Sequence, residues 1–210
     1  MTLINSALTM AVKLGSESGY RAWLANDAPK LKPIFDRTGV KQKVVLMSGR
    51  HVIAYYKSDR PGAVEAAFAD PVAVAMMQGS LGALLDFSAG MTNFKSEFRW
   101  DCQVDYQPTH VALLLKVKAG QEAAYLNWVH HGLQPQFDAV WRRFKLAHKE
   151  VLMSGNQAMA FYRCKDSTSV LGTFGESESI AAMNTNLGPL LDLQAGAPMA
   201  PFEQAYEWNA

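Results

Sequence analysis

Histidines near the ends of strand-like segments could perform acid–base chemistry. His51 and His110 each occupy such a position, and an imidazole that titrates near neutral pH can act there as a general acid or base. The alternative for each is a histidine that hydrogen-bonds only to backbone or water. Asp27 and His130 lie late in two corresponding helical segments and complete the candidate catalytic set. For His130, with the adjacent His131, the alternative is a solvated helix surface. His148 precedes a strand and is expected at the surface.

A second group of side chains could hold a ligand in place. Lys116, Tyr55 and Arg163 could bind or polarise oxygen atoms. Tyr55 and Phe161 could also stack on an aromatic ring, and packing of the interior is the alternative for both rings. The candidate substrate-binding residues are Asn5, Thr9, Tyr55, Lys57, Lys116, Met159, Phe161 and Arg163.

Several other chemistries lack their sequence signatures. The two cysteines, Cys102 and Cys164, have no metal-type spacing around them. The chain has no glycine-rich dinucleotide or phosphate loop, no His-Glu-x-x-His and no Gly-x-Ser-x-Gly. We therefore expect no metal and no cofactor.

Composition indicates a globular protein that binds a small molecule. The 210 residues are 49% hydrophobic and 19% charged, with a formal net charge of +1, which favours neither nucleic acid nor a membrane surface as a partner. The first residues lack a signal sequence, and no segment has the apolar length of a membrane helix. We expect a cytoplasmic protein, and a homodimer of the whole chain is left open.

An internal duplication determines how the candidate residues are positioned. The string Val-Leu-Met-Ser-Gly occurs at Val45–Gly49 and again at Val151–Gly155, 106 positions later. The same offset relates Ala54–Lys57 to Ala160–Arg163. We therefore divide the chain into two repeats, residues 1–106 and 107–210.

Each repeat has the element order βαββαβ by its hydrophobic periodicity. A strand over 6–12 precedes a helical segment that runs from Glu17 to Gly39, and a Ser-Gly turn joins the next two strands. Pro61 introduces the second helical segment. The expected strands are 6–12, 43–47, 52–57 and 97–104, then 111–117, 149–153, 158–164 and 202–208. The expected helices of the second repeat are 121–144 and 177–191.

This order predicts an α+β fold. A βαββαβ unit is the ferredoxin-like motif, an antiparallel sheet with both helices on one face. The uncovered faces of two such sheets can be buried if they face each other. We therefore expect two tandem ferredoxin-like repeats that form a pseudo-dimeric α+β barrel with the helices outside.

Strand alternation separates a helix-facing side from an interior side. Leu8, Ala54 and Tyr56 represent the helix-facing set, whereas the opposite set mixes apolar, aromatic and polar side chains. Such a mixture is typical of a small-molecule pocket. The tryptophans that recur in both repeats, together with Trp141, are expected to serve the core.

The segment Gly39–Leu46, the hairpin with His51 and the strand end Lys57-Ser58-Asp59 carry a resemblance to a known family. With Asp70-Pro71 and Leu81–Leu85, they resemble the dimeric α+β barrel superfamily. Within it, the residues are most similar to tetracenomycin-type aromatic polyketide cyclases.

The resemblance implies a cavity for a poly-β-ketone or aromatic compound, with a His-Asp pair near the end of the first helix. Asn26-Asp27 and His130-His131 occupy the corresponding positions, so neither repeat keeps that pair. The leading hypothesis is a cofactor-independent, cyclase-like enzyme that acts on an aromatic or polyketide-like carbonyl compound. The alternatives are a non-catalytic carrier or sensor, and a monooxygenase or haem-binding protein of the same fold.

Overall fold

A computed structural model describes residues 3–192 and 200–210. Residues 1–2 and 193–199, which belong to the two expected repeats and include the start of the segment searched for a signal sequence, lie outside the described residues. Two compact units emerge from the fold: unit 1 comprises Met1–Asn93 with Gln204–Ala210, and unit 2 comprises Phe94–Glu203.

Eight antiparallel strands are hydrogen-bonded in the closed barrel order β1-β3-β2-β8-β5-β7-β6-β4. The order within each repeat is therefore β4-β1-β3-β2 or β8-β5-β7-β6, the order of a ferredoxin-like sheet. This confirms the expected α+β fold class. The strands are β1 (Ile4–Ala11), β2 (Val40–Ser48), β3 (His51–Ser58), β4 (Thr92–Asp101), β5 (Thr109–Lys116), β6 (His148–Ser154), β7 (Gln157–Cys164) and β8 (Phe202–Asn209).

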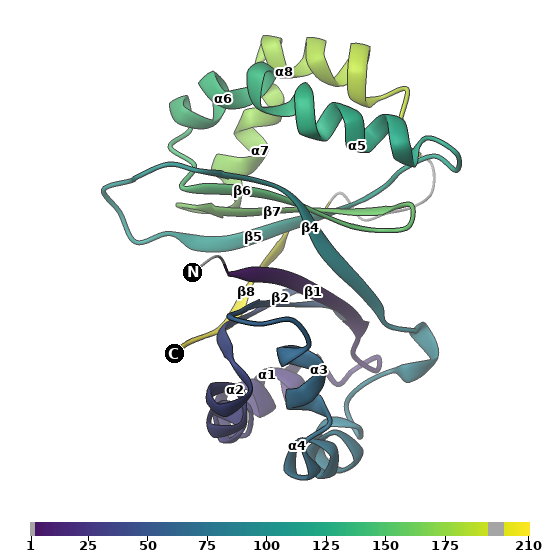
Figure 1. The fold of residues 1–210 in the computed structure, drawn as a ribbon, viewed down its shortest axis with the longest axis vertical. Helices are drawn as coiled ribbons and strands as arrows, with labels where there is room; N and C mark the ends of the chain where they lie inside the picture. The colour runs from purple at the N-terminus through teal and green to yellow at the C-terminus, as the bar shows by residue number, and fades with distance from the viewer. Residues whose placement is uncertain (1–2, 193–199) are drawn as a thin grey trace. The chain divides into compact units, whose positions relative to one another are not determined.

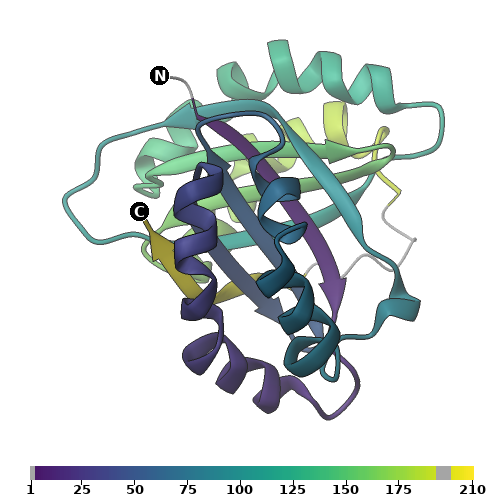
Figure 2. The same cartoon turned by 60° about the horizontal axis from the view of Figure 1, so that its bottom comes forward.

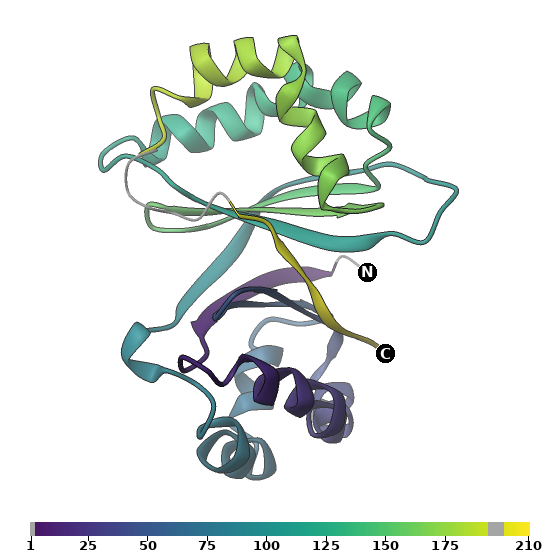
Figure 3. The same cartoon turned by 180° about the vertical axis from the view of Figure 1, so that it is seen from behind.

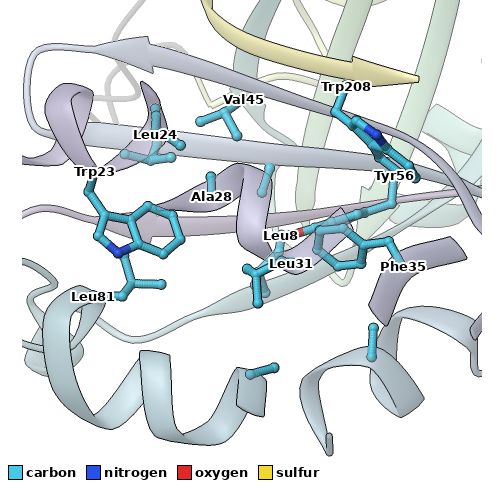
Figure 4. Close-up of a cluster of buried hydrophobic side chains, with 14 of the residues drawn as sticks. Leu8, Trp23, Leu24, Ala28, Leu31, Phe35, Val45, Tyr56, Leu81 and Trp208 are labelled. Carbon is cyan, nitrogen blue, oxygen red and sulfur yellow. The ribbon is translucent and has the colours of Figure 1, made fainter. Parts of the chain in front are cut away.

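The helices of unit 1 lie against one face of the sheet formed by β1, β3 and β2 (Figure 2). Leu8, Ala54 and Tyr56 are buried beneath them, as their strand positions predict. In Figure 4, Trp208 and Phe35 lie close to Tyr56 in this core, and the Phe35 and Trp208 ring centroids are 5.7 Å apart. The helices are α1 (Glu17–Asn26), η1 (Ala28–Leu31), α2 (Lys32–Thr38), α3 (Ala63–Phe68), α4 (Pro71–Met76), η2 (Met77–Leu81) and η3 (Phe87–Ala89).

Unit 2 repeats this arrangement on its own sheet. Its helices cover one face of β5, β7 and β6 (Figures 1 and 3). Val111, Val151 and Tyr162 belong to the buried cluster beneath them, and Trp141 is also part of it. The helices are α5 (Glu122–His131), α6 (Leu133–Arg143), α7 (Ser167–Gly175), α8 (Ser177–Ala182) and η4 (Met183–Leu187).

The duplicated Ser-Gly pairs form equivalent hairpin turns. Gly49 and Gly155 follow β2 and β6, and both have φ of +54°. Glycine reaches this left-handed region without the steric penalty of a Cβ atom. The repeated string therefore encodes a turn that sets the register of each hairpin.

The expected helical segments are interrupted in the structure. The segment 121–144 divides at Gly132, where an added Cβ would come within 2.7 Å of the Trp128 ring. Pro29 and Pro33 occupy the first turns of η1 and α2 and similarly divide the segment 17–39. Close packing and proline thus override a continuous helical period.

One helix was not expected, and the bounds of one strand are wrong. Helix α7 was not expected, although Asp166 caps it by accepting a hydrogen bond from the Ser169 amide at 2.8 Å. Its Ser-, Thr- and Gly-rich sequence has too weak an apolar period to reveal it. Strand β4 lies at Thr92–Asp101, earlier than the expected 97–104.

Candidate functional site

A row of polar side chains crosses the sheet of unit 2. The pairing places His110 opposite Arg163, Arg163 opposite His148, and His148 opposite Asp101. Residues that are directly opposite in antiparallel strands project from the same face. Their neighbours along the strands, Tyr162 among them, pack under the helices, so this row lies on the face without helices.

A second row lies beside the first on the same face. It runs from Ala112 to Phe161, then to Glu150 and Arg99. Position 150 is two residues beyond position 148, so both side chains leave β6 on the same side. The two rows bring two histidines, two carboxylates, two arginines and one phenyl ring to a single patch.

The centre of this patch is an imidazole held between two carboxylates. His148 Nδ1 lies 2.7 Å from Asp101 Oδ1, and His148 Nε2 lies 3.3 Å from Glu150 Oε2. The His148 side chain is 3% exposed and that of Glu150 is 0% exposed, whereas that of Asp101 is 64% exposed. The three groups therefore form a chain from solvent to a fully buried carboxylate.

Aromatic and cationic groups surround this chain. Phe161 lies between the histidines, with ring-centroid distances of 5.5 Å to His110 and 6.2 Å to His148. Arg99 lies 3.9 Å from Glu150 Oε1. A buried carboxylate needs such partners because burial removes its hydration. Arg99 thus stabilises the charge of Glu150, and His148 adds a hydrogen bond to it when Nε2 carries a proton.

The geometry suits reversible proton transfer at one nitrogen atom. An ionised carboxylate only accepts hydrogen bonds, so Asp101 holds His148 with a proton on Nδ1. The longer contact, from Nε2 to Glu150, is the one that an incoming group can replace. Nε2 can then take a proton, and Glu150 stabilises the resulting imidazolium.

Unit 1 has the same rows with different chemistry. Asn5, Lys57 and Gln42 face one another across β1, β3 and β2, in place of His110, Arg163 and His148. Gln42 Nε2 donates to Glu207 Oε1 at 2.8 Å, and Val44 stands where the second repeat has Glu150. The duplication therefore retained the scaffold twice but placed the buried imidazole–carboxylate pair in unit 2.

Three of the candidate site residues come together in unit 2. His110, Arg163 and Phe161 all lie in the two rows, and His110 and Phe161 are 2% and 0% exposed. The expectation that His148 lies at the surface is wrong. His148 is the first residue of β6 and is 2% exposed, because its strand begins one residue earlier than expected and turns this side chain onto the polar face.

The remaining catalytic candidates lie outside this patch. His51 is exposed at the first position of β3. His130 is exposed on α5, and its Nε2 is 3.1 Å from the Glu97 backbone oxygen. Asp27 pairs with Lys30 at 2.5 Å. These three side chains therefore lie apart from the His148 patch, and their catalytic roles stay predictions.

The other substrate-binding candidates are distributed over both units. Tyr55 and Asn5 are buried in unit 1, at 0% and 4% exposure, and Thr9 is half-buried opposite Ile53. Met159 is fully buried in unit 2. Lys116 lies 4.0 Å from Asp192. Their contact with a substrate stays a prediction.

Sequence patterns alone do not select Asp101, Glu150 and Arg99 as site residues. The sequence does contain a signal for Glu150. It is a charged residue inside an expected strand, and the equivalent residue of the first repeat, Val44, is apolar. A charge that only one of two repeats carries at a buried strand position points to function, since burial of a charge is unfavourable without a specific partner.

A buried lysine recurs on the helix side of both sheets. Lys43 Nζ lies 5.2 Å from the Phe35 ring centroid, and Lys149 Nζ lies 4.0 Å from that of Tyr162. Burial lowers the pKa of Lys43 to about 8. Burial also lowers the pKa of Lys149 well below its usual value, against the opposing effect of Glu150.

Replacing Lys43 with Met should change how stability depends on pH. Above pH 8 the unfolded chain keeps a proton on this lysine that the folded chain has released, so this group makes wild-type stability rise with pH until the unfolded lysine also titrates. Between pH 7 and pH 10 we expect the free energy of unfolding of the variant to fall by roughly 1–3 kcal/mol relative to that of wild type.

Urea unfolding at pH 7, 8, 9 and 10 measures this difference. The series stops at pH 10 because burial raises the pKa of Tyr20 and of Tyr56, so both proteins lose stability at higher pH. A stability difference that stays constant over the four pH values contradicts the assignment.

The residues described by the structure give few signs of other chemistries. Among them, no group of three or more His, Cys, Asp or Glu side chains is arranged to hold a metal ion. Within the same residues, no helix has the length and hydropathy to cross a membrane. Burial raises the pKa of the Cys164 thiol to about 12, which makes it a poor nucleophile.

Comparison with known proteins identifies the fold. No protein-family model and no curated protein matches the sequence. A monooxygenase-type protein from Fusobacterium nucleatum has a similar structure, with a TM-score of 0.64 and 11% identity over 99% of this chain and 94% of that one. For another, from Lactobacillus acidophilus, the TM-score is 0.62 at 7% identity, over 100% and 97% of the two chains.

A third solved structure is described as that of an anthrone oxidase-like protein. Its TM-score is 0.55 at 9% identity, and the match covers 100% of this chain and 94% of that chain. Identities this low demonstrate a common fold alone.

Proposed function

We propose that this protein is a cofactor-independent enzyme that removes a proton from a carbon atom whose anion is conjugated with an aromatic carbonyl group. The observation that supports the proposal is His148 held between Asp101 and Glu150, beside the Phe161 ring. This arrangement combines a base of fixed orientation with an aromatic ring beside it, against which a substrate ring could pack once it enters the patch.

Each residue of the patch has a role in this reaction. Asp101 accepts the hydrogen bond from Nδ1 and thereby leaves Nε2 as the basic atom. The substrate replaces the 3.3 Å contact between Nε2 and Glu150, and Nε2 takes its proton. Glu150 then stabilises the imidazolium, and Phe161 packs against the substrate ring. His110 serves as a second polar group on the far side of Phe161.

The resulting enolate can react with dioxygen. For anthrone, removal of one proton from the methylene carbon gives an enolate that reduces O₂. The balanced reaction is C₁₄H₁₀O + O₂ → C₁₄H₈O₂ + H₂O, in which the methylene carbon becomes a carbonyl carbon and the second oxygen atom leaves as water. The similar folds described as monooxygenase-type and anthrone oxidase-like support this fate.

Ring closure is the second fate of the same enolate. In a polyketide-like substrate, the carbanion attacks a carbonyl carbon of the same molecule, and the alkoxide that forms takes the proton back from His148. The base is identical in both reactions. The resemblance to tetracenomycin-type cyclases supports this alternative.

A haem-binding function receives less support from this patch. An axial histidine needs a ring nitrogen that is free to bind iron, and at His148 iron would have to replace the same Nε2–Glu150 contact that the proposed substrate replaces, beside the Phe161 ring. A carrier or sensor would need only the binding surface, and it would release its ligand unchanged.

Oxygen consumption with anthrone tests the proposal. Purified protein treated with a chelator is mixed with anthrone, and we expect O₂ uptake above the protein-free rate with one anthraquinone formed per O₂. Formation of a cyclised product from a polyketide-like substrate, without O₂ uptake, would instead favour the cyclase. Binding of anthrone with neither proton exchange nor turnover would favour the carrier.

A further inference from the structure

We infer that Arg163 binds a carboxylate group of the substrate, so that the substrate is an anionic aromatic carbonyl compound. This inference rests on the proposed function and specifies its substrate class. Arg163 stands in the polar row between His110 and His148 and directly precedes the buried Cys164. A group bound to its guanidinium therefore lies beside the imidazole that transfers the proton.

The guanidinium of Arg163 lacks the partners that other arginines have. Its Nε is buried without a hydrogen-bond partner, and no described carboxylate lies within ion-pair distance of it. An unpaired buried donor is unfavourable for stability, so a ligand that supplies an acceptor there is favoured. Six of the other arginines have carboxylate partners in the described residues: Arg37, Arg50, Arg60, Arg99, Arg142 and Arg143.

The seventh, Arg21, is exposed on α1 and can be hydrated. Arg163 is different because it combines a buried Nε with a missing counterion. Its side chain is nevertheless half-buried, whereas His110 and His148 on either side are 2% exposed. A dissolved anion can therefore reach the guanidinium more easily than it can reach either imidazole.

The chemistry of the row favours a singly charged, planar anion. A guanidinium forms two parallel hydrogen bonds with a carboxylate. Asp101 and Glu150 lie on the same face, and their negative charges would oppose a dianion such as a phosphate monoester. A carboxylate on the aromatic substrate fits both conditions.

The other repeat offers an internal comparison. Lys57 occupies the position of Arg163 in unit 1, between Asn5 and Gln42. Both repeats thus place a cation there, but only Arg163 has the planar fork and the neighbouring histidines. We expect carboxylate recognition to reside in unit 2.

Calorimetry with two matched compounds tests the inference. Anthraquinone-2-carboxylate and anthraquinone-2-carboxamide have the same ring system, but only the first is an anion. We expect wild type to bind the carboxylate more tightly. Arg163→Met should weaken carboxylate binding about 10- to 100-fold and leave amide binding within about twofold. Arg163→Lys should retain part of the preference, because it keeps the charge but loses the fork.

Control variants separate local from general effects. Arg21→Met removes one exposed positive charge and should not change the preference. Lys57→Met should reduce it less than Arg163→Met does. The inference is overturned if wild type does not prefer the carboxylate, if Arg163→Met weakens both compounds equally, or if Lys57→Met has the larger effect.

His148→Gln distinguishes this inference from the proposed function. It should abolish proton transfer while retaining the preference for the carboxylate. If His148→Gln loses turnover but wild type shows no preference for the carboxylate, the acid–base function is supported and the role of Arg163 is refuted. If wild type prefers the carboxylate but turns over no substrate, the role of Arg163 is supported and the acid–base function is refuted.

Discussion

Replacing His148 with Gln is expected to lower kcat/KM for anthrone oxidation about 100- to 10,000-fold, the range of general acid–base catalysis. Glutamine can occupy the space between Asp101 and Glu150 and form hydrogen bonds to them, but it cannot take up a proton. Initial rates of O₂ uptake at several anthrone concentrations measure the change.

His131→Gln provides the control for this substitution. His131 is exposed on α5, so the same chemical change there should alter kcat/KM by less than about twofold. Equal activity of His148→Gln and wild type would remove His148 from the mechanism. Circular dichroism of both variants shows whether a loss of activity reflects a loss of fold.

Replacing Glu150 with Ala is expected to destabilise the protein by about 3–5 kcal/mol, as breaking a buried charged pair does. The substitution removes the carboxylate that lies 3.3 Å from His148 and 3.9 Å from Arg99 and leaves a void at a fully buried position. Urea unfolding at pH 7 measures the free energy of unfolding.

Val44→Ala is the matched control, because Val44 occupies the equivalent position in the first repeat and is likewise 0% exposed. Loss of its two methyl groups should reduce stability by roughly 2 kcal/mol. If Glu150→Ala were no more destabilising than Val44→Ala, the contacts of the carboxylate with His148 and Arg99 would not contribute to stability. Glu150→Gln, which keeps the volume, should lie between these two variants.

The repeated sequence was sufficient to predict the fold, because period-two alternation and the duplicated Ser-Gly turns are local properties. Tyr56 and Ala54 lie under the helices as their alternation predicts. The helix breaks at Gly132 and at Pro33 depend on packing and on short-range geometry, which hydrophobic periodicity does not report. Hydrophobic periodicity does not predict helix α7, because its apolar residues have too weak a helical period. Its clearest sequence signal is the N-terminal cap, Asp166.

The site was predicted only in part. His110, Arg163 and Phe161 were selected because they lie on the interior face of their strands, and pairing across β5 and β7 brings them together. His148 was misplaced because the start of β6 decides its burial, and strand ends depend on neighbouring strands. Asp101 reaches the site only through the pairing of β4 with β6, a long-range contact that no local pattern specifies.

Deuterium exchange into anthrone under anaerobic conditions tests the role of His148 as the base, because it reports proton abstraction whatever the later fate of the enolate. The protein is incubated with anthrone in D₂O without oxygen, and mass spectrometry follows deuterium at the methylene carbon. We expect exchange well above the buffer rate for wild type and exchange at the buffer rate for His148→Gln. Exchange by wild type no faster than in buffer, or undiminished exchange by His148→Gln, would contradict this role.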